Sequence, residues 1–256
     1  MQPLQDESAF EWIREIRDRI GLAKPRPAPQ GPGTFISDLI PPQFESYAQI
    51  LGRFDARYDD IDNPLSPSEQ RVLGISNCEP LKSFILERRS TSPTTRIRWK
   101  EMAALLNLPY VPEINFTWFR RRMDGWCVSR LINLFTGKWP GSEECEELIS
   151  VLTMFTASEE CIFRMPSEYI YHPRPQPMLY SGLLSEVSAF LQARHTVFEY
   201  WWPSDRRWCF CWDSDVGATI IGGPKDLIST LIANPVIECI EAPPSTRVDS
   251  EVPLPK

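Results

Sequence analysis

The segment between His195 and Asp215 constrains the fold of this chain more strongly than any other part of the sequence. It contains four of the nine tryptophans, and apolar and polar residues alternate on either side of Pro-Ser-Asp-Arg at 203–206. Alternation is typical of a half-buried strand, and that tetrapeptide is typical of a turn. The segment therefore predicts an antiparallel hairpin with strands near 196–202 and 208–213.

The two-residue period of a strand assigns these side chains to opposite faces of the hairpin. On the first strand we expect one face to hold Thr196, Phe198, Tyr200 and Trp202, and the other to hold Val197, Glu199 and Trp201. On the return strand we expect Trp208, Phe210 and Trp212 on the core face, and Cys209, Cys211 and Asp213 opposite. The hairpin is then mainly framework, which leaves its turn and the 213–215 end for contacts with other molecules.

The residues after the hairpin predict a helix and a final strand. Gly222-Gly223 and Pro224 lead into an apolar stripe of helical spacing, which Asn234-Pro235 ends; its members are Leu227, Ile228, Leu231 and Ile232. Residues 236–240 then alternate as in a strand. The predicted C-terminal order is strand, strand, helix, strand.

Helical spacing of apolar residues recurs through the rest of the chain. It predicts helices at 8–20, 44–51, 99–106, 143–155 and 184–191, and a strand at 161–165. Capping boxes begin the first of these helices, at Ser8 and Glu11, and a further helix at Ser66-Pro67-Ser68-Glu69. We therefore expect an α+β fold, with a mainly helical N-terminal part packed on an antiparallel sheet that ends in a β-β-α-β unit.

Proline-rich stretches mark the expected domain boundaries. Four prolines lie between Ala23 and Gly33, so residues 1–33 are expected to form a short helix and an extended linker. A single α+β domain is expected over 34–241, followed by a Pro-rich polar tail over 242–256.

Composition narrows the class of protein. The hydrophobic content of 42% and charged content of 24% are ordinary for a globular chain, and no apolar run is long enough to span a bilayer. The N-terminus lacks the features of a secretory signal, and the seven cysteines are scattered, so we expect reduced thiols, a cytoplasmic location and no membrane contact.

Charge bears on the expected partner. The net charge of −7 argues against nucleic acid, although Arg120-Arg121-Arg122, near Trp118 and Trp126, leaves contact with a polyanion as a weaker alternative.

The closing block resembles that of a large family of uncharacterised bacterial proteins. The residues that carry the resemblance are Trp202-Pro-Ser-Asp-Arg-Arg-Trp-Cys, Asp213-Ser-Asp, and Ile221-Gly-Gly with the following helix and Glu238. Segments 44–51, 98–103, 148–156 and 161–163 are similar as well, whereas Met165-Pro-Ser-Glu stands where the family has Trp-x-Gly. The resemblance covers 35–241 and implies one cytoplasmic α+β domain. It implies no catalytic residue, because the family has no established activity.

Several residues suggest chemistry without forming a complete set. Cys209 and Cys211 lack the paired spacing and histidine partners of a structural zinc site, so we interpret them as core residues. Asp213 and Asp215 form a D-x-D pair that is able to share a divalent cation, and with Asp205 and His195 they define the enzymatic alternative. Gly222-Gly223 before a helix would suit an anion, but no P-loop lysine follows.

The hypothesis favoured by the sequence is a non-enzymatic protein-binding module of the immunity or toxin-neutralising kind, with no cofactor and no metal. An acidic chain suits a basic protein partner. Tryptophan and arginine are favoured interface anchors. The expected binding residues are Trp201, Trp202, Asp205, Arg206, Arg207, Asp213 and Asp215. The alternative is a small metal-dependent enzyme that uses the Asp213/Asp215 region.

Overall fold

The chain divides into two compact units. Unit 1 comprises Met1–Leu51 and Lys138–Asp249, and unit 2 comprises Gly52–Gly137 and Ser250–Lys256. The sequence predicts a single domain over 34–241, and the structure divides this range between the units. The computed structural model describes residues 1–4, 6–21, 33–52, 54–57, 83, 86–87, 94–122, 132–134, 143–156, 159–166, 179–194, 197–213, 216–249 and 252–254.

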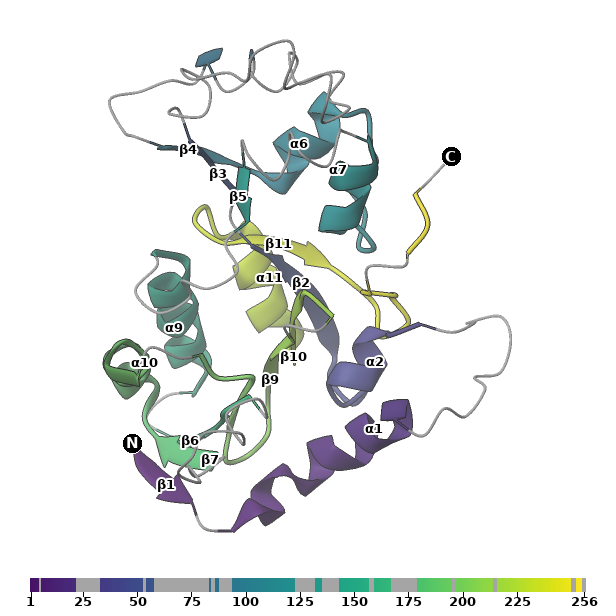
Figure 1. Cartoon of the computed structure of the whole chain (residues 1–256). Helices are drawn as coiled ribbons and strands as arrows, with labels where there is room; N and C mark the ends of the chain where they lie inside the picture. Colours follow the sequence, from purple (N-terminus) through teal and green to yellow (C-terminus); the bar gives the residue numbers. More distant parts are fainter. Residues whose placement is uncertain are drawn as a thin grey trace. The chain divides into compact units, whose positions relative to one another are not determined.

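Within the described residues, unit 1 is built on an eight-stranded antiparallel sheet in the order β1-β7-β6-β8-β9-β10-β2-β11 (Figure 1). The strands are β1 (Gln2–Leu4), β2 (Ser46–Leu51), β6 (Cys161–Arg164), β7 (Leu179–Gly182), β8 (Tyr200–Pro203), β9 (Cys209–Asp213), β10 (Ala218–Gly223) and β11 (Glu238–Glu241). The fold is α+β, as the sequence predicts.

Helices cover both faces of this sheet (Figure 1). One side carries α9 (Glu143–Thr156), η3 (Leu184–Glu186), α10 (Val187–Arg194) and α11 (Lys225–Ala233), and the other carries η1 (Glu7–Phe10), α1 (Glu11–Gly21) and α2 (Ile36–Leu39). The strands are therefore buried on both faces, and two apolar clusters form, one on each side of the sheet.

The predicted hairpin is β8 and β9, paired through Tyr200 with Cys211 and Trp201 with Phe210. The predicted faces of the return strand are confirmed, because Trp208 and Phe210 lie in the α9 cluster and Cys209 and Cys211 lie in the α1 cluster. Among the described residues of the first strand, the predicted faces fail at Phe198 and Glu199.

Phe198 lies in the cluster of Trp201 instead of that of Trp202. Glu199, predicted on the face of Trp201, instead pairs with Arg164, whose guanidinium lies over Phe10 in the cluster of Trp202. The side chains alternate strictly between the two faces only from Tyr200, where β8 begins, because the backbone bends at Glu199. The backbone N–H of Glu199 donates to Arg164 O at 2.7 Å, and its carbonyl oxygen accepts from Trp212 N at 2.7 Å.

Two elements differ from the sequence-based prediction. Residues 44–51 do not form a helix: Ser46–Leu51 is strand β2, which lies between β10 and β11. All six residues are buried, and a strand covered on both faces carries a near-continuous apolar run that also satisfies helical spacing. Strand β10 was not predicted, so the C-terminal order is β8, β9, β10, α11, β11, and Gly222 and Gly223 end a strand.

The predicted N-terminal segment begins in the sheet, since β1 pairs with β7 at its edge. Helical structure follows to Gly21, with Asp6 at the N-cap in place of the predicted Ser8; its Oδ1 accepts from Ser8 N at 2.8 Å. Phe10 and Ile13 are buried against the sheet. Residues 1–4 and 6–16 are thus built into unit 1, and the linker prolines lie outside the described residues.

Residues 242–249, at the start of the predicted tail, pack against α2. Ile36 N donates to Thr246 O at 3.0 Å, Ser37 N to Pro244 O at 3.0 Å, and Val248 N to Thr34 O at 2.9 Å. Val248 is buried in the cluster on the α1 side of the sheet. These hydrogen bonds join the two chain segments that make up unit 1.

Unit 2 contains, in its described part, a three-stranded antiparallel sheet in the order β4-β3-β5 and two helices. The elements are β3 (Phe54–Arg57), β4 (Thr94–Ile97), α6 (Trp99–Leu105), α7 (Phe116–Arg122) and β5 (Ile132–Leu134). Their core is aromatic: Trp99 stacks on Phe54 at 4.7 Å between ring centroids and lies 5.1 Å from Phe119. None of the described helices in either unit is long and apolar enough to cross a membrane.

The helices at 99–106, 143–155 and 184–191 are confirmed. The strands predicted at 161–165 and 236–240 are present as β6, Cys161–Arg164, and β11, Glu238–Glu241. The capping box at Ser66-Pro67-Ser68-Glu69 lies outside the described residues.

Candidate functional site

The turn between β8 and β9 presents four consecutive exposed residues, 204–207. Arg206 N donates to Pro203 O at 2.9 Å, which closes the turn after β8. Arg206 itself has a φ of 59°, a left-handed conformation that is uncommon for a residue with a side chain. The predicted turn is therefore confirmed, with a strained backbone at its fourth residue, Arg206.

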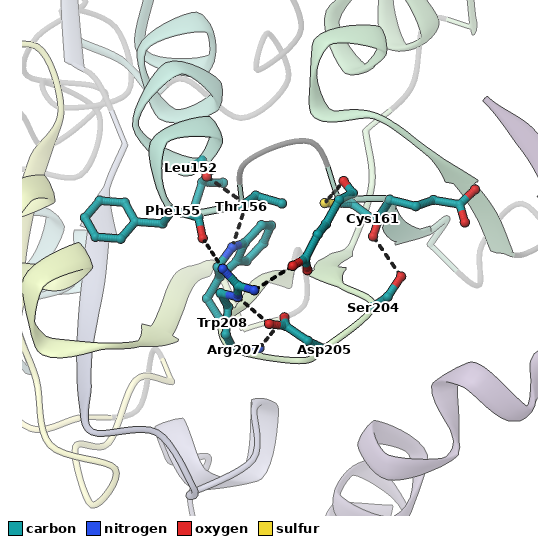
Figure 2. Close-up of polar contacts among 10 residues, drawn as sticks. Leu152, Phe155, Thr156, Cys161, Ser204, Asp205, Arg207 and Trp208 are labelled. Atoms are coloured by element: carbon teal, nitrogen blue, oxygen red, sulfur yellow. Dashed lines mark hydrogen bonds and ion pairs between the residues drawn. The ribbon is translucent and has the colours of Figure 1, made fainter.

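Arg207 braces this turn against the end of α9 (Figure 2). Its Nη1 donates to Phe155 O at 3.1 Å, its Nη2 to Glu159 Oε1 at 2.7 Å, and its Nε to Asp205. Asp205 also accepts from Arg207 N at 3.1 Å. The carboxylates raise the pKa of Arg207, chiefly through the hydrogen bond that its guanidinium donates to Asp205. A cation at the last turn of a helix also suits the negative end of its dipole.

Ser204 makes a second set of contacts with the segment between α9 and β6. Its backbone N and its Oγ both donate to Glu160 O, at 3.1 and 2.9 Å (Figure 2). The side chains of Glu160 and Ser204 are exposed. The turn is thus held at both ends, by Ser204 and by Arg207.

Trp208 fixes the base of the turn from the core side. Its indole Nε1 donates to Thr156 Oγ1 at 2.9 Å, and that hydroxyl donates to Leu152 O at 2.7 Å. Trp208 is fully buried and Thr156 ends α9. Hence the hairpin, the helix and the exposed turn form one connected structure.

Arg206 lies on the other side of the turn, above α1. Its guanidinium carbon is 5.0 Å from the centroid of the Trp12 ring. Trp12 in turn meets Trp202 edge-on at 6.0 Å and Phe44 edge-on at 6.5 Å. We define the turn surface as the exposed residues of the turn together with exposed or half-buried residues at the end of α9 and just after it, where the turn makes its contacts: Met154, Glu159, Glu160, Ser204, Asp205, Arg206 and Arg207.

Trp201 and Trp202 do not reach the surface. Their exposed fractions are 2% and 0%, and they lie on opposite faces of the sheet in its two apolar clusters. Both faces are covered by helices, which the hairpin sequence alone does not reveal. Of the predicted contact residues, Asp205, Arg206 and Arg207 are brought together in the turn.

The described acidic residue of the D-x-D pair, Asp213, is 5% exposed at the end of β9. Its Oδ1 accepts from Val216 N at 3.0 Å, and its carbonyl accepts from Gly217 N at 2.9 Å, so it organises the turn into β10. Asp215 and His195 lie outside the described residues. Among the residues that are described, no three Cys, His, Asp or Glu side chains gather as a metal site would require.

The other candidate residues have structural surroundings. Cys209 and Cys211 are fully buried, and burial raises the pKa of each thiol well above its ordinary value. At the start of α11, Lys225 N donates to Glu45 Oε2 at 3.0 Å, so a carboxylate of the chain occupies the position proposed for an anion. In unit 2, Arg120, Arg121 and Arg122 are exposed at the end of α7.

Trp118, which precedes these arginines, is buried, and its Nε1 donates to Val252 O at 3.1 Å. Its ring is therefore not available to stack on a base. Trp126 lies outside the described residues.

Comparison with family models, with characterised proteins and with solved structures finds no match for this chain. The resemblance to the bacterial family stays a prediction.

The sequence did not indicate the brace or the stacked pair. Arg207 meets Phe155, which is 52 positions away, and Trp12 lies on a helix assigned to a separate segment. One signal was present in the sequence: two consecutive arginines, Arg206 and Arg207, directly follow an aspartate in the predicted turn. Met154, with 66% of its surface exposed, is visible only once the buried face of α9 is known.

Proposed function

We propose that this protein is a non-enzymatic binding module that recognises another protein through the turn surface. The observation that carries the proposal is the brace: Arg207 and Ser204 hold an exposed, charged turn in one conformation by contacts with Phe155, Glu159 and Glu160. A loop that is ordered before binding loses less conformational entropy when a partner docks. Ordered exposed loops of this kind are suited to recognition.

The composition of the turn surface supports this function. Arginine and methionine are enriched at protein interfaces, and both are displayed here. Met154 is the most exposed large apolar side chain among the described residues, and it directly precedes Phe155, whose carbonyl accepts from Arg207. An exposed apolar side chain one position from a residue that the brace contacts offers a partner apolar surface to bury, and the ordered charges of the turn offer orientation.

The charge of unit 1 favours a basic partner. Its sequence contains 23 Asp and Glu against 13 Lys and Arg. A surplus of this size attracts a partner of opposite charge and raises the rate of encounter. We therefore propose a basic protein partner, of the kind that an immunity or toxin-neutralising protein would bind in the cytoplasm of a bacterium.

No contact of the described residues favours the alternative of a metal-dependent enzyme. The carboxylate of Asp213 is already used by Val216 N. A rise in the melting temperature on adding Mg²⁺ or Mn²⁺ that is lost in Asp213→Asn would favour the enzyme over the binding module.

Site-specific photo-cross-linking in cells tests the proposed function. A photoreactive amino acid is introduced at Glu160, whose exposed side chain lies in the turn surface and which contacts Ser204 only through its backbone carbonyl, and in a control at Ser229, which is exposed on α11. We expect one discrete cross-linked protein from position 160 and none from position 229. The species should disappear when Arg206→Gly is added, because glycine tolerates the positive φ and removes only the side chain.

Two outcomes of this experiment would contradict the proposed function. Equal cross-linking from both positions, or none from position 160 at wild-type expression, would overturn the assignment of function to this surface. For the toxin-neutralising form of the proposal, the identified partner should inhibit growth when expressed alone and not when co-expressed with this chain.

A further inference from the structure

Arg206 is the charged side chain of the turn that the brace leaves unused. Asp205 and Arg207 bind each other, and Arg207 also binds Glu159. Arg206, in contrast, makes no hydrogen bond or ion pair through its guanidinium with any residue that the structure describes, and it is exposed. Its N–H donors are directed to solvent.

The position of this guanidinium is nonetheless fixed. Trp12 lies beneath it, with 5.0 Å from the guanidinium carbon to the ring centroid. The indole is held by edge-on contacts with Trp202, at an interplanar angle of 71°, and with Phe44, at 75°. An arginine held over an aromatic ring is pre-organised and still keeps donors for a planar acceptor.

The backbone of Arg206 contributes as well. Its φ of 59° is retained by the hydrogen bond from Arg206 N to Pro203 O and by the adjoining bond from Arg207 N to Asp205 Oδ1. Strained residues of this kind persist where the surroundings over-determine them, often at binding sites. The strain aims a charged side chain at the ring of α1.

We infer that Arg206, stacked on Trp12, is a receptor for a single carboxylate presented by the partner protein. This inference rests on the proposed function for its partner, and it adds the chemical group that the turn recognises. A guanidinium offers two parallel N–H donors that match a carboxylate. A basic partner would therefore place one acidic group at this point of its surface.

The surrounding charges select a carboxylate over a phosphate. The turn surface carries three acidic groups, Glu159, Glu160 and Asp205, and two guanidiniums. A dianionic phosphate would face this net negative charge, whereas a monoanion is repelled less. Two carboxylate sources share this chemistry: an acidic side chain and the C-terminus of a chain.

The test is a titration of the full-length protein followed by the arginine Nε–Hε signals in ¹H–¹⁵N spectra. The probes are N-acetyl-glutamate N-methylamide for a side chain, N-acetyl-alanine for a C-terminus, and inorganic phosphate. We expect the Arg206 signal to shift saturably with one of the two carboxylates, at least about tenfold more tightly than those of Arg120 and Arg121. Those two arginines are exposed on α7 and serve as internal controls.

Two variants separate recognition from structure. Arg206→Lys retains the charge but not the fork of donors, and should weaken carboxylate binding about tenfold with unchanged melting. Trp12→Phe retains a smaller ring and should give intermediate affinity. An Arg206 response no stronger than that of Arg120, or tighter binding of phosphate than of either carboxylate, would overturn the inference. Selective carboxylate binding without a cross-link from position 160 would instead leave the receptor intact and remove the proposed function.

Discussion

Replacing Glu199 by glutamine should destabilise unit 1 by about 2–3 kcal/mol, because it breaks a nearly buried ion pair. Glu199 on the bend before β8 and Arg164 on β6 form an ion pair, and their side chains are only 8% and 13% exposed. The guanidinium carbon of Arg164 also lies 4.2 Å from the centroid of the Phe10 ring, so a helix covers the pair. Removing one charge leaves the other poorly solvated.

A matched control separates burial from charge. The pair of Arg14 and Glu7 has its side chains 37% and 51% exposed, so Glu7→Gln should cost at most about 1 kcal/mol. The double variant Arg164→Met/Glu199→Leu replaces both charges by apolar side chains of similar length. It should recover most of the stability lost in Glu199→Gln.

The assay is urea denaturation of each variant, with the free energy of unfolding obtained by linear extrapolation. Hydrogen exchange of the β6 and β8 amides assigns the loss to unit 1. A loss in Glu199→Gln no larger than that in Glu7→Gln would refute the reasoning, as would a double variant less stable than the single one.

Three further predictions concern the backbone and the thiols. Asn107, with a φ of 52°, follows α6, and Leu108 N donates to Ala103 O at 2.8 Å. In thermal melts Asn107→Ala should lower the free energy of unfolding by about 1 kcal/mol, whereas Asn107→Gly should leave it almost unchanged. A Cβ at Gly222 would lie 2.5 Å from Phe44 Cδ2 and 2.9 Å from Tyr47 Cδ1, so Gly222→Ala should cost about 1–3 kcal/mol, and Phe44→Leu should relieve part of it. Burial raises the pKa of Cys145, Cys161 and Cys239 to about 12, above the ordinary value of 9.0. These thiols should resist alkylation at pH 8, and the free energy of unfolding should fall by about 1.4 kcal/mol per thiol per pH unit as the pH rises from 9 to 12.

Local patterns carried the correct part of the sequence-based prediction. The β8–β9 hairpin, α9 and α11 were predicted because alternation, turn residues and helical spacing act over a few positions. The strand β2 was mistaken for a helix because a central strand buried on both faces has no polar side to reveal its period. For the same reason Trp201 and Trp202 looked like surface anchors.

The features that the sequence did not predict depend on contacts between segments that are far apart in the chain. Nothing near Arg207 in the sequence indicates that Phe155 and Glu159 will receive its donors. Likewise, the proline-rich stretch after Gly21 suggested a separate segment, yet Phe10, Trp12 and Ile13 pack on the sheet. Only the folded chain brings Trp12 beneath Arg206 and gives the turn its displayed charge.

The most direct test of the turn surface is the affinity of the purified partner for Arg206→Gly, measured by isothermal titration calorimetry beside the wild type and the control Arg121→Gly. Glycine fits the φ of 59°, so the variant should fold with undiminished stability. Loss of a pre-organised arginine anchor should weaken binding by at least about tenfold, while Arg121→Gly binds as the wild type does. Unchanged affinity in Arg206→Gly would contradict recognition through the β8–β9 turn.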